Sequence, residues 1–171
     1  MNIVLLGYMG SGKSTIGKIL AKRLNYTFID FDAYIEQLEG MTIPQIFEKK
    51  GEIHFRKKES VYISRVLEQH ENSIVALGGG TPCYGNNMSY ILGLAKNVVY
   101  LKVSVMGLSK RLMPEKSGRP LIKNIADEDL TEFIGKHLFE RSVFYQQATM
   151  TIDCDGKDVE TIVGEIQKKL V

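Results

Sequence analysis

Residues 7–14 have the composition and spacing of a phosphate-binding loop. This segment, GYMGSGKS, fits the pattern G-x-x-x-x-G-K-S, follows an apolar run and leads into a helical pattern. Its glycines let successive backbone N–H groups point at phosphate oxygens, and the following helix adds the positive end of its dipole. Lys13 can reach the β- and γ-phosphates, and the Ser14 hydroxyl can bind Mg²⁺. Because spacing and context coincide, we predict a nucleoside triphosphate with Mg²⁺ here rather than a glycine-rich turn without a ligand.

Two carboxylates follow the second apolar segment of the chain, in the sequence FIDFD at residues 28–32. Strand alternation would place Asp30 and Asp32 on the same side, at the carboxyl end of a strand beside the P-loop. One could help to hold Mg²⁺ while the other accepts a proton from a substrate hydroxyl. The alternative is that Asp32 caps the helix that follows, a role that is compatible with a function in the site.

Arginines and a run of three glycines form a second set of candidates. Arg56 lies four residues after Glu52, so an ordinary ion pair along a helix is one interpretation, and single arginines such as Arg141 are usually solvated. Residues 78–80, at the end of a predicted strand, are all glycine. Three glycines in a row lower the stability of the fold, so their presence suggests that something must approach the main chain closely. Two arginines with such a glycine platform would make a plausible fork for a substrate carboxylate.

The elements that must position these residues alternate between strand-like and helix-like patterns. The predicted strands are 2–7, 27–31, 73–77, 97–103 and 150–154. The predicted helices are 13–24, 33–39, 43–49, 52–69, 87–95, 106–112, 130–147 and 159–170. Strands separated by helices imply parallel pairing with right-handed crossovers, so we predict a three-layer α/β/α fold. Residues 113–125 (MPEKSGRPLIKNI) lack a period and are predicted to form a mobile loop.

Composition and charge exclude several classes of function. The chain has 171 residues, of which 44% are hydrophobic and 25% charged, which suits one domain. Its net charge of +2 lacks the excess of basic residues that is typical of nucleic-acid-binding proteins. Cys83 and Cys154 have no partner at metal-ligand spacing and fit free thiols in a reducing compartment. With neither a signal-peptide pattern nor a run of about 18 apolar residues, we expect a cytoplasmic protein that does not enter a membrane.

Taken together, these motifs resemble those of the shikimate kinases along the full length of the chain. The P-loop, FIDFD, GEIHFR, LGGG, GRPL and FERSVFY match family elements in this order. The G-E-x-x-F-R and GGG elements are far more specific than a P-loop. The resemblance implies one P-loop kinase domain over residues 1–171, with a five-stranded parallel sheet of order 2-3-1-4-5. It also implies a shikimate-binding helical region at about residues 32–60 and a mobile lid at about 112–125.

The resemblance further implies a role for each matched residue. The nucleotide would be bound by Gly10, Ser11, Gly12, Lys13, Ser14, Thr15, Arg111 and Arg119. The acceptor would be bound by Asp32, Arg56, Gly78, Gly79, Gly80 and Arg141. Asp32 would be the general base, Arg119 would stabilise the transferring phosphate, and Ser14 with Asp30 would hold the metal. Since Ala76 stands where a Walker B carboxylate would be, Asp30 is the better candidate for the metal side.

The reaction implied is ATP plus shikimate giving shikimate 3-phosphate and ADP, a step of chorismate and aromatic amino acid biosynthesis. Mg²⁺ would be the cofactor, and the partners would be two small molecules bound by a monomer. Another small-hydroxyl kinase, such as a gluconate kinase, stays possible, although the pairing of G-E-x-x-F-R with GGG argues against it. A non-catalytic ATP-binding switch is the third alternative, but Lys13, Asp32, Arg56, Arg119 and Arg141 are all present.

Overall fold

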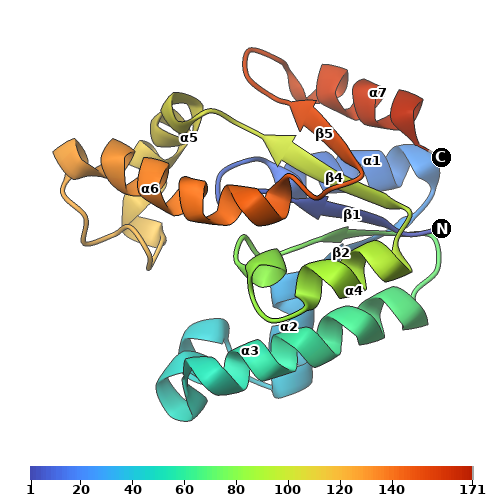
Figure 1. Cartoon of the computed structure of the whole chain (residues 1–171), viewed down its shortest axis with the longest axis horizontal. Coiled ribbons are helices and arrows are strands. Elements are labelled where there is room, and N and C mark those ends of the chain that lie inside the picture. Colours follow the sequence, from blue (N-terminus) through green and yellow to red (C-terminus); the bar gives the residue numbers. More distant parts are fainter. Residues whose placement is uncertain (171) are drawn as a thin grey trace.

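A five-stranded parallel sheet forms the middle layer of the computed structural model, which describes residues 1–170 (Figure 1). The strands are β1 (Ile3–Leu6), β2 (Thr27–Asp30), β3 (Ser73–Ala76), β4 (Asn97–Lys102) and β5 (Met150–Asp153). Their order in the sheet is β2-β3-β1-β4-β5, which confirms the predicted topology. Each predicted strand is present, shorter by one or two residues at its ends.

Helices cover both faces of the sheet (Figure 1). They are α1 (Lys13–Leu24), α2 (Phe31–Glu39), α3 (Ile43–Gln69), α4 (Asn87–Leu94), α5 (Val105–Leu112), α6 (Asp127–Tyr145) and α7 (Val159–Lys169). Short 3₁₀ helices occur at η1 (Thr81–Cys83) and η2 (Met113–Gly118). The right-handed crossovers place α1 and α7 together on one face, and α3, α4 and α6 on the other.

Burial explains why β1 lies in the centre of the sheet. All four of its residues are completely buried, as expected of a parallel strand covered on both faces. β1 pairs with β3 on one side, where Leu5 is opposite Ala76, and with β4 on the other, where Leu6 is opposite Tyr100. The P-loop after β1 and the glycine triplet after β3 therefore leave the sheet side by side at its carboxyl edge.

One predicted break between helices is confirmed, and one predicted loop differs from the structure. The helices predicted at 43–49 and 52–69 are separated within α3 by Gly51, whose φ of 83° and ψ of 168° are not helical. Residues 113–125 are not a plain loop, because η2 occupies their first half and Ile122 is completely buried. The 3₁₀ turns of this segment are too short to produce a helical period, and its prolines also argue against a helix, so the sequence pattern did not reveal them.

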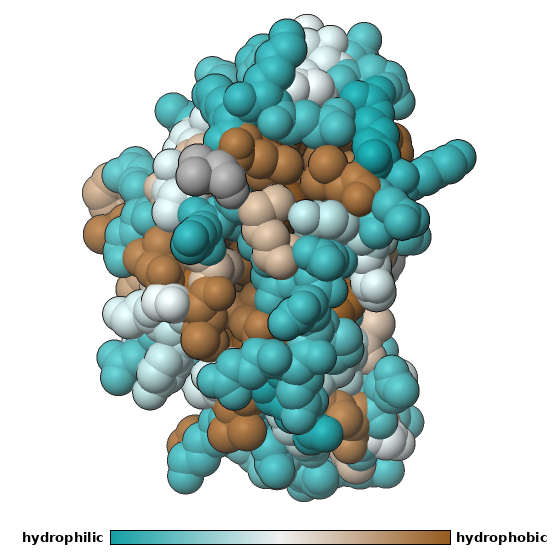
Figure 2. Space-filling model, turned by 90° about the vertical axis from the view of Figure 1, so that its right-hand side faces the viewer, coloured by the Kyte–Doolittle hydropathy of each residue, from teal (hydrophilic) through white to brown (hydrophobic). Residues whose placement is uncertain are grey.

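The face opposite the carboxyl edge carries both chain termini. Figure 2 shows that hydrophilic side chains cover most of this face, with hydrophobic patches between them. No helix in the described part of the chain combines the length and the apolar character needed to cross a bilayer.

Gly17 of α1 faces the sheet so closely that a methyl group should not fit. A Cβ at this position would lie 2.5 Å from Phe28 Cε2 and 3.2 Å from Leu5 Cδ1. Alanine favours a helix by up to about 1 kcal/mol, but overpacking costs about 1–3 kcal/mol, so we expect Gly17→Ala to be destabilising. Thermal unfolding should show a fall in Tm of about 2–10 °C.

Gly164 of α7 is the matched control, because a Cβ there would meet nothing within 4 Å. Gly164→Ala should leave Tm unchanged or raise it. If Gly17→Ala had a Tm at or above that of the unaltered protein, the packing of α1 on the sheet described here would be wrong.

Candidate active site

A cavity of about 520 Å³ lies at the carboxyl edge of the sheet. Most of the predicted site residues line it, but Ser11, Arg56, Gly80 and Arg141 do not. The P-loop forms its floor, and Asp30 and Asp32 line it from the start of α2. The lining also includes Gly78 and Gly79, together with Arg111, Glu115 and Arg119. Four separate segments of the sequence therefore face one volume, as expected at the carboxyl ends of parallel strands.

The P-loop is held in a conformation that suits glycine. Gly10 has φ 81° and Gly12 has φ 93°, in the region that side chains with a Cβ rarely adopt. Lys13 Nζ donates hydrogen bonds to the carbonyl oxygens of Gly7 at 2.8 Å and Tyr8 at 3.0 Å. Burial lowers the pKa of Lys13 to about 8, and the nearby Asp32 charge opposes that shift. The ammonium group of the half-buried Lys13 thus bridges the loop on which phosphates would lie.

Asp30, and not Asp32, caps α2. Its Oδ1 accepts a hydrogen bond from Ala33 N at 3.2 Å, and its Oδ2 accepts one from Ser14 Oγ at 3.4 Å. The capping interpretation for Asp32 is therefore wrong, as is the placement of Asp32 on a strand. The helix begins at Phe31 because the carboxylate at the end of β2 satisfies a free N–H of the first helical turn. Both carboxylates nevertheless face the cavity.

Asp32 has the electrostatics expected of a proton acceptor. Burial raises the pKa of its carboxyl to about 6, the negative charges of Asp30 and Glu59 add to the shift, and Lys13 opposes it. A Cβ on Gly78 would lie only 2.7 Å from Asp32 Oδ1, so the glycine allows this close approach. A carboxylate with a pKa close to neutral can both exist as a base and hold the proton it takes.

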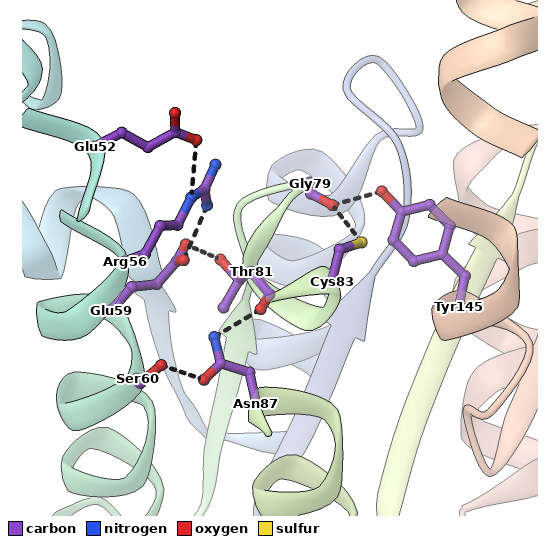
Figure 3. A network of polar contacts seen from close by, with 9 residues as sticks. All are labelled: Glu52, Arg56, Glu59, Ser60, Gly79, Thr81, Cys83, Asn87 and Tyr145. Carbon is purple, nitrogen blue, oxygen red and sulfur yellow. Dashed lines mark hydrogen bonds and ion pairs between the residues drawn. The ribbon is translucent and has the colours of Figure 1, made fainter. Parts of the chain in front are cut away.

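Arg56 belongs to a polar network that joins α3 to the segment after β3 (Figure 3). Its Nη1 donates to Glu59 Oε2 at 2.9 Å, while the Glu52 pair predicted from the spacing is longer, at 3.7 Å. Glu59 is 1% exposed, and its other oxygen accepts a hydrogen bond from Thr81 Oγ1 at 2.7 Å. The guanidinium group also lies over the ring of Tyr84, 3.6 Å from the centroid. These contacts fix the direction in which Arg56 points.

The structure brings Arg56 and Arg141 together over the glycine triplet. A Cβ on Gly79 would lie 3.0 Å from Arg141 Nη1. A Cβ on Gly80 would lie 3.2 Å from Arg56 Nη1 and 3.3 Å from Arg141 Nη2. The absence of side chains here leaves room for two guanidinium groups, one from α3 and one from α6, to point at the same place. Such a pair can bind a carboxylate.

The two lid-side arginines have different partners. Arg111 Nη1 donates to the carbonyl oxygen of Gly10 at 3.1 Å, which places it against the P-loop. Arg119 pairs with Glu115 through Nη2 at 2.6 Å and Nε at 3.1 Å. Lys116 ties this segment to the start of α6 through the carbonyl oxygen of Ile125, at 2.6 Å, and through the carboxylate of Asp127. Arg119 is therefore at the cavity but bound to a neighbour on its own segment.

Several residues of the site escaped prediction from the sequence, although their spacing held a signal. Glu59 lies three residues after Arg56 and shares a face of α3 with it. Glu115 lies four residues before Arg119, close enough in sequence for an ion pair. Thr81 gave no such signal, because its partner Glu59 belongs to a different element.

Comparisons with known proteins agree with this geometry. The family model described as "Shikimate kinase" matches residues 9–171. A shikimate kinase from Flavobacterium psychrophilum is 45% identical over 168 residues, which covers 98% of this chain and 98% of the relative. The crystal structure of a shikimate kinase from Bacteroides thetaiotaomicron has a TM-score of 0.91 at 37% identity, with 98% of this chain and 97% of that one covered. A shikimate kinase from Acinetobacter baumannii in complex with shikimate has a TM-score of 0.85 at 32% identity, with coverage of 99% and 95%.

The charge of Asp32 should cost stability, so we expect Asp32→Asn to raise Tm more at pH 8 than at pH 4. The native pKa of about 6 lies above the value of about 3.9 in an unfolded chain, so the native state holds this proton more tightly. Stability is therefore lost as the pH rises from about 4 through 6, and the amide avoids that loss. Thermal unfolding of both proteins at the two pH values measures the difference.

Asp158 serves as the control, because it caps α7 and its hydrogen bonds to Thr161 lower its pKa. Asp158→Asn should not gain stability with rising pH. An equal gain for Asp32→Asn at pH 4 and pH 8 would show that the carboxyl is not perturbed in the way described.

Proposed function

The chain belongs to the shikimate kinase family, and on that premise we propose that it transfers the γ-phosphoryl group of ATP to shikimate. The products are shikimate 3-phosphate and ADP, in a step of chorismate and aromatic amino acid biosynthesis. One observation carries the proposal: Arg56 and Arg141 converge on the glycine triplet directly beside a P-loop and the carboxylate of Asp32. A fork for a carboxylate, a base and a phosphate loop are what phosphorylation of a hydroxy acid requires.

The nucleotide phosphates bind on the P-loop. Its N–H groups and the amino end of α1 receive the phosphate oxygens, through Gly10, Ser11, Gly12, Lys13, Ser14 and Thr15. Lys13 exchanges its two carbonyl acceptors for phosphate oxygens, a charge-assisted contact that outweighs neutral ones. Arg111 lies beside the adenine, and its contact with the carbonyl oxygen of Gly10 supports a place at the edge of the nucleotide site.

Ser14 and Asp30 fit a Mg²⁺ ion. Their oxygens lie 3.4 Å apart on the wall of the cavity, and both are hard oxygen ligands. Groups of three or more histidine, cysteine or acidic side chains suited to a metal do not occur within residues 1–170. That agrees with Mg²⁺, which takes one or two protein ligands and completes its shell with water and phosphate. When bound, the ion neutralises negative charge on the phosphates.

The acceptor lies over the glycine triplet. Arg56 and Arg141 bind its carboxylate, and residues 78–80 let the ring approach the main chain. Asp32 binds the reacting hydroxyl and takes its proton as the oxygen attacks phosphorus. Because the pKa of Asp32 is about 6, most of the carboxyl is ionised and ready to accept that proton at neutral pH.

Arg119 stabilises the transferring phosphoryl group, and residues 112–125 form the lid that delivers it. In the structure Arg119 forms a partly exposed ion pair with Glu115, and this pair must first separate. Such exposed pairs contribute only about 0–1 kcal/mol, so the exchange for a phosphate is inexpensive. Closure would also exclude water that could otherwise take the phosphate. Residues 32–60 form the acceptor-binding region, and the whole chain acts as one domain.

A single chain supplies every residue of this site, which supports catalysis by a monomer on two small molecules. The net charge of +2 gives no basis for binding nucleic acid. Cys83 and Cys154 are free thiols, which supports a reducing compartment and hence a cytoplasmic location without a membrane partner.

Release of ADP from ATP and Mg²⁺, measured in parallel with shikimate, with gluconate and without an acceptor, tests the function. We expect release with shikimate only. Asp32→Asn should lower turnover by about 10²–10⁴-fold, since it keeps the shape but removes the proton acceptor. Asp158→Asn makes the same chemical change away from the site and should keep full turnover.

Release with gluconate alone would assign the chain to a different acceptor, and binding of ATP without release under any condition would indicate a switch. A loss below tenfold for Asp32→Asn would remove the carboxyl from its role as base.

Arg56→Lys and Arg141→Lys should each weaken shikimate binding while ATP affinity stays almost constant. Lysine keeps the charge but loses the planar pair of donors. We expect a loss of about 1.5–3 kcal/mol, the contribution of one charged hydrogen bond, in titration calorimetry. Arg65→Lys is the control, because Arg65 is exposed on α3 and bonds only to Gln69 within residues 1–170. Unaltered shikimate binding in both site variants would exclude the carboxylate fork.

A further inference from the structure

One face of α6 touches three parts of the site. His137, Arg141 and Tyr145 are spaced by four residues, so they lie on the same side of the helix. Tyr145 Oη donates a hydrogen bond to the carbonyl oxygen of Gly79 at 2.5 Å, as Figure 3 shows. His137 Nδ1 is hydrogen-bonded to the phenol of Tyr8 at 2.8 Å. Arg141, which points at the acceptor space, therefore lies between a contact to the glycine triplet and a contact to the P-loop.

Tyr8 belongs to the P-loop but reaches α6. Its side chain is 1% exposed, with the ring edge-on to His137 at 5.4 Å and 5.7 Å from the guanidinium carbon of Arg141. Its carbonyl oxygen accepts hydrogen bonds from Lys13 Nζ at 3.0 Å and from Ser11 N at 3.1 Å. The main chain of one residue thus holds the phosphate-binding lysine, while its side chain contacts the helix that carries the acceptor arginine.

The surroundings of the Tyr8–His137 bond favour the neutral form of both side chains. Burial raises the pKa of Tyr8 to about 12, while burial and then the positive charge of Arg141 lower the pKa of His137, with Glu140 opposing. A neutral phenol and a neutral imidazole share one hydrogen bond in either tautomer. Because Tyr8 is buried, leaving this bond unmade would cost the full desolvation of its hydroxyl. The bond therefore holds the P-loop to α6 with a defined geometry.

We propose that Tyr8 and His137 are positioning residues that couple nucleotide binding on the P-loop to acceptor binding at Arg141. The inference rests on the proposed function. When phosphates draw Lys13 away from the Tyr8 carbonyl, the loop readjusts at Tyr8, and the hydrogen bond to His137 passes that adjustment to α6. The Tyr145–Gly79 bond fixes the other end of the same helical face, so the position of Arg141 changes between them. Coupling between two sites is reciprocal, so each ligand raises the affinity of the other.

The test is the ratio of shikimate dissociation constants without and with a non-hydrolysable ATP analogue and Mg²⁺, measured by titration calorimetry. We expect a ratio of about 5 or more for the unaltered protein. Tyr8→Phe and His137→Leu should each lower it about two- to fivefold, toward the value of 1 expected without coupling. The double variant should fall no further, and His137→Asn, which can restore the bond, should recover the ratio.

Tyr62→Phe is the matched control, because it removes another buried tyrosine hydrogen bond, that of Tyr62 Oη to Glu39 at 2.5 Å. It should lower Tm but leave the ratio unchanged. A ratio of 1 for the unaltered protein overturns the inference. So does an unaltered ratio in Tyr8→Phe and His137→Leu with only Tm reduced, which would make the bond purely structural.

Turnover of the unaltered protein with shikimate separates this test from the proposed function. Normal turnover with an unaltered ratio in the variants removes the coupling alone. Absence of both turnover and shikimate binding in the unaltered protein would overturn the proposed function and the inference with it.

Discussion

The parallel pairing of β1 with β3 is the constraint on which the site depends. It sets Leu5 opposite Ala76, and the hydrogen bond from Leu77 N to Leu5 O continues the ladder to the edge of the sheet. Two loops that can approach a ligand with bare main chain, the P-loop and the glycine triplet, then begin at adjacent points. The residues proposed to bind the two substrates are arranged around that junction. A shift in this register would move one loop relative to the other and separate phosphate from acceptor.

Burial disfavours the ionised forms of Lys13 and Asp32, two charged side chains at this junction. Burial lowers the pKa of Lys13 to about 8 and raises that of Asp32 to about 6, so each ionised form is disfavoured where it stands. The buried Glu59 offsets the charge of Arg56, and Glu115 offsets that of Arg119. The ligands of the proposed function would bring compensating charges to these groups. Their binding should therefore stabilise the folded protein as well as start the reaction.

Long-range hydrogen bonds give the site its rigidity. The acceptor side is anchored through Thr81 and Glu59, the glycine triplet through Tyr145, and the P-loop through Tyr8 and His137. The two residues of each bond are at least 22 positions apart in the sequence. Function in this fold therefore depends on helices that carry few of the reacting groups, because those helices determine where the groups point.

The sequence by itself determined the elements and the local chemistry. The P-loop at residues 7–14 and the start of α1 could be predicted, because glycine spacing and helical periodicity are patterns that span only a few residues. The order of the strands came from the family resemblance. The residues alone suggested a fork of two arginines on the glycine platform, and the resemblance assigned Arg56 and Arg141 to it. Only the tertiary structure decided that Asp30 caps α2 and that Tyr8 bonds to His137, 129 positions away. The reason is physical: a two-residue shift of a helix start exchanges two aspartates, and contacts between distant elements depend on packing distances that no local pattern encodes.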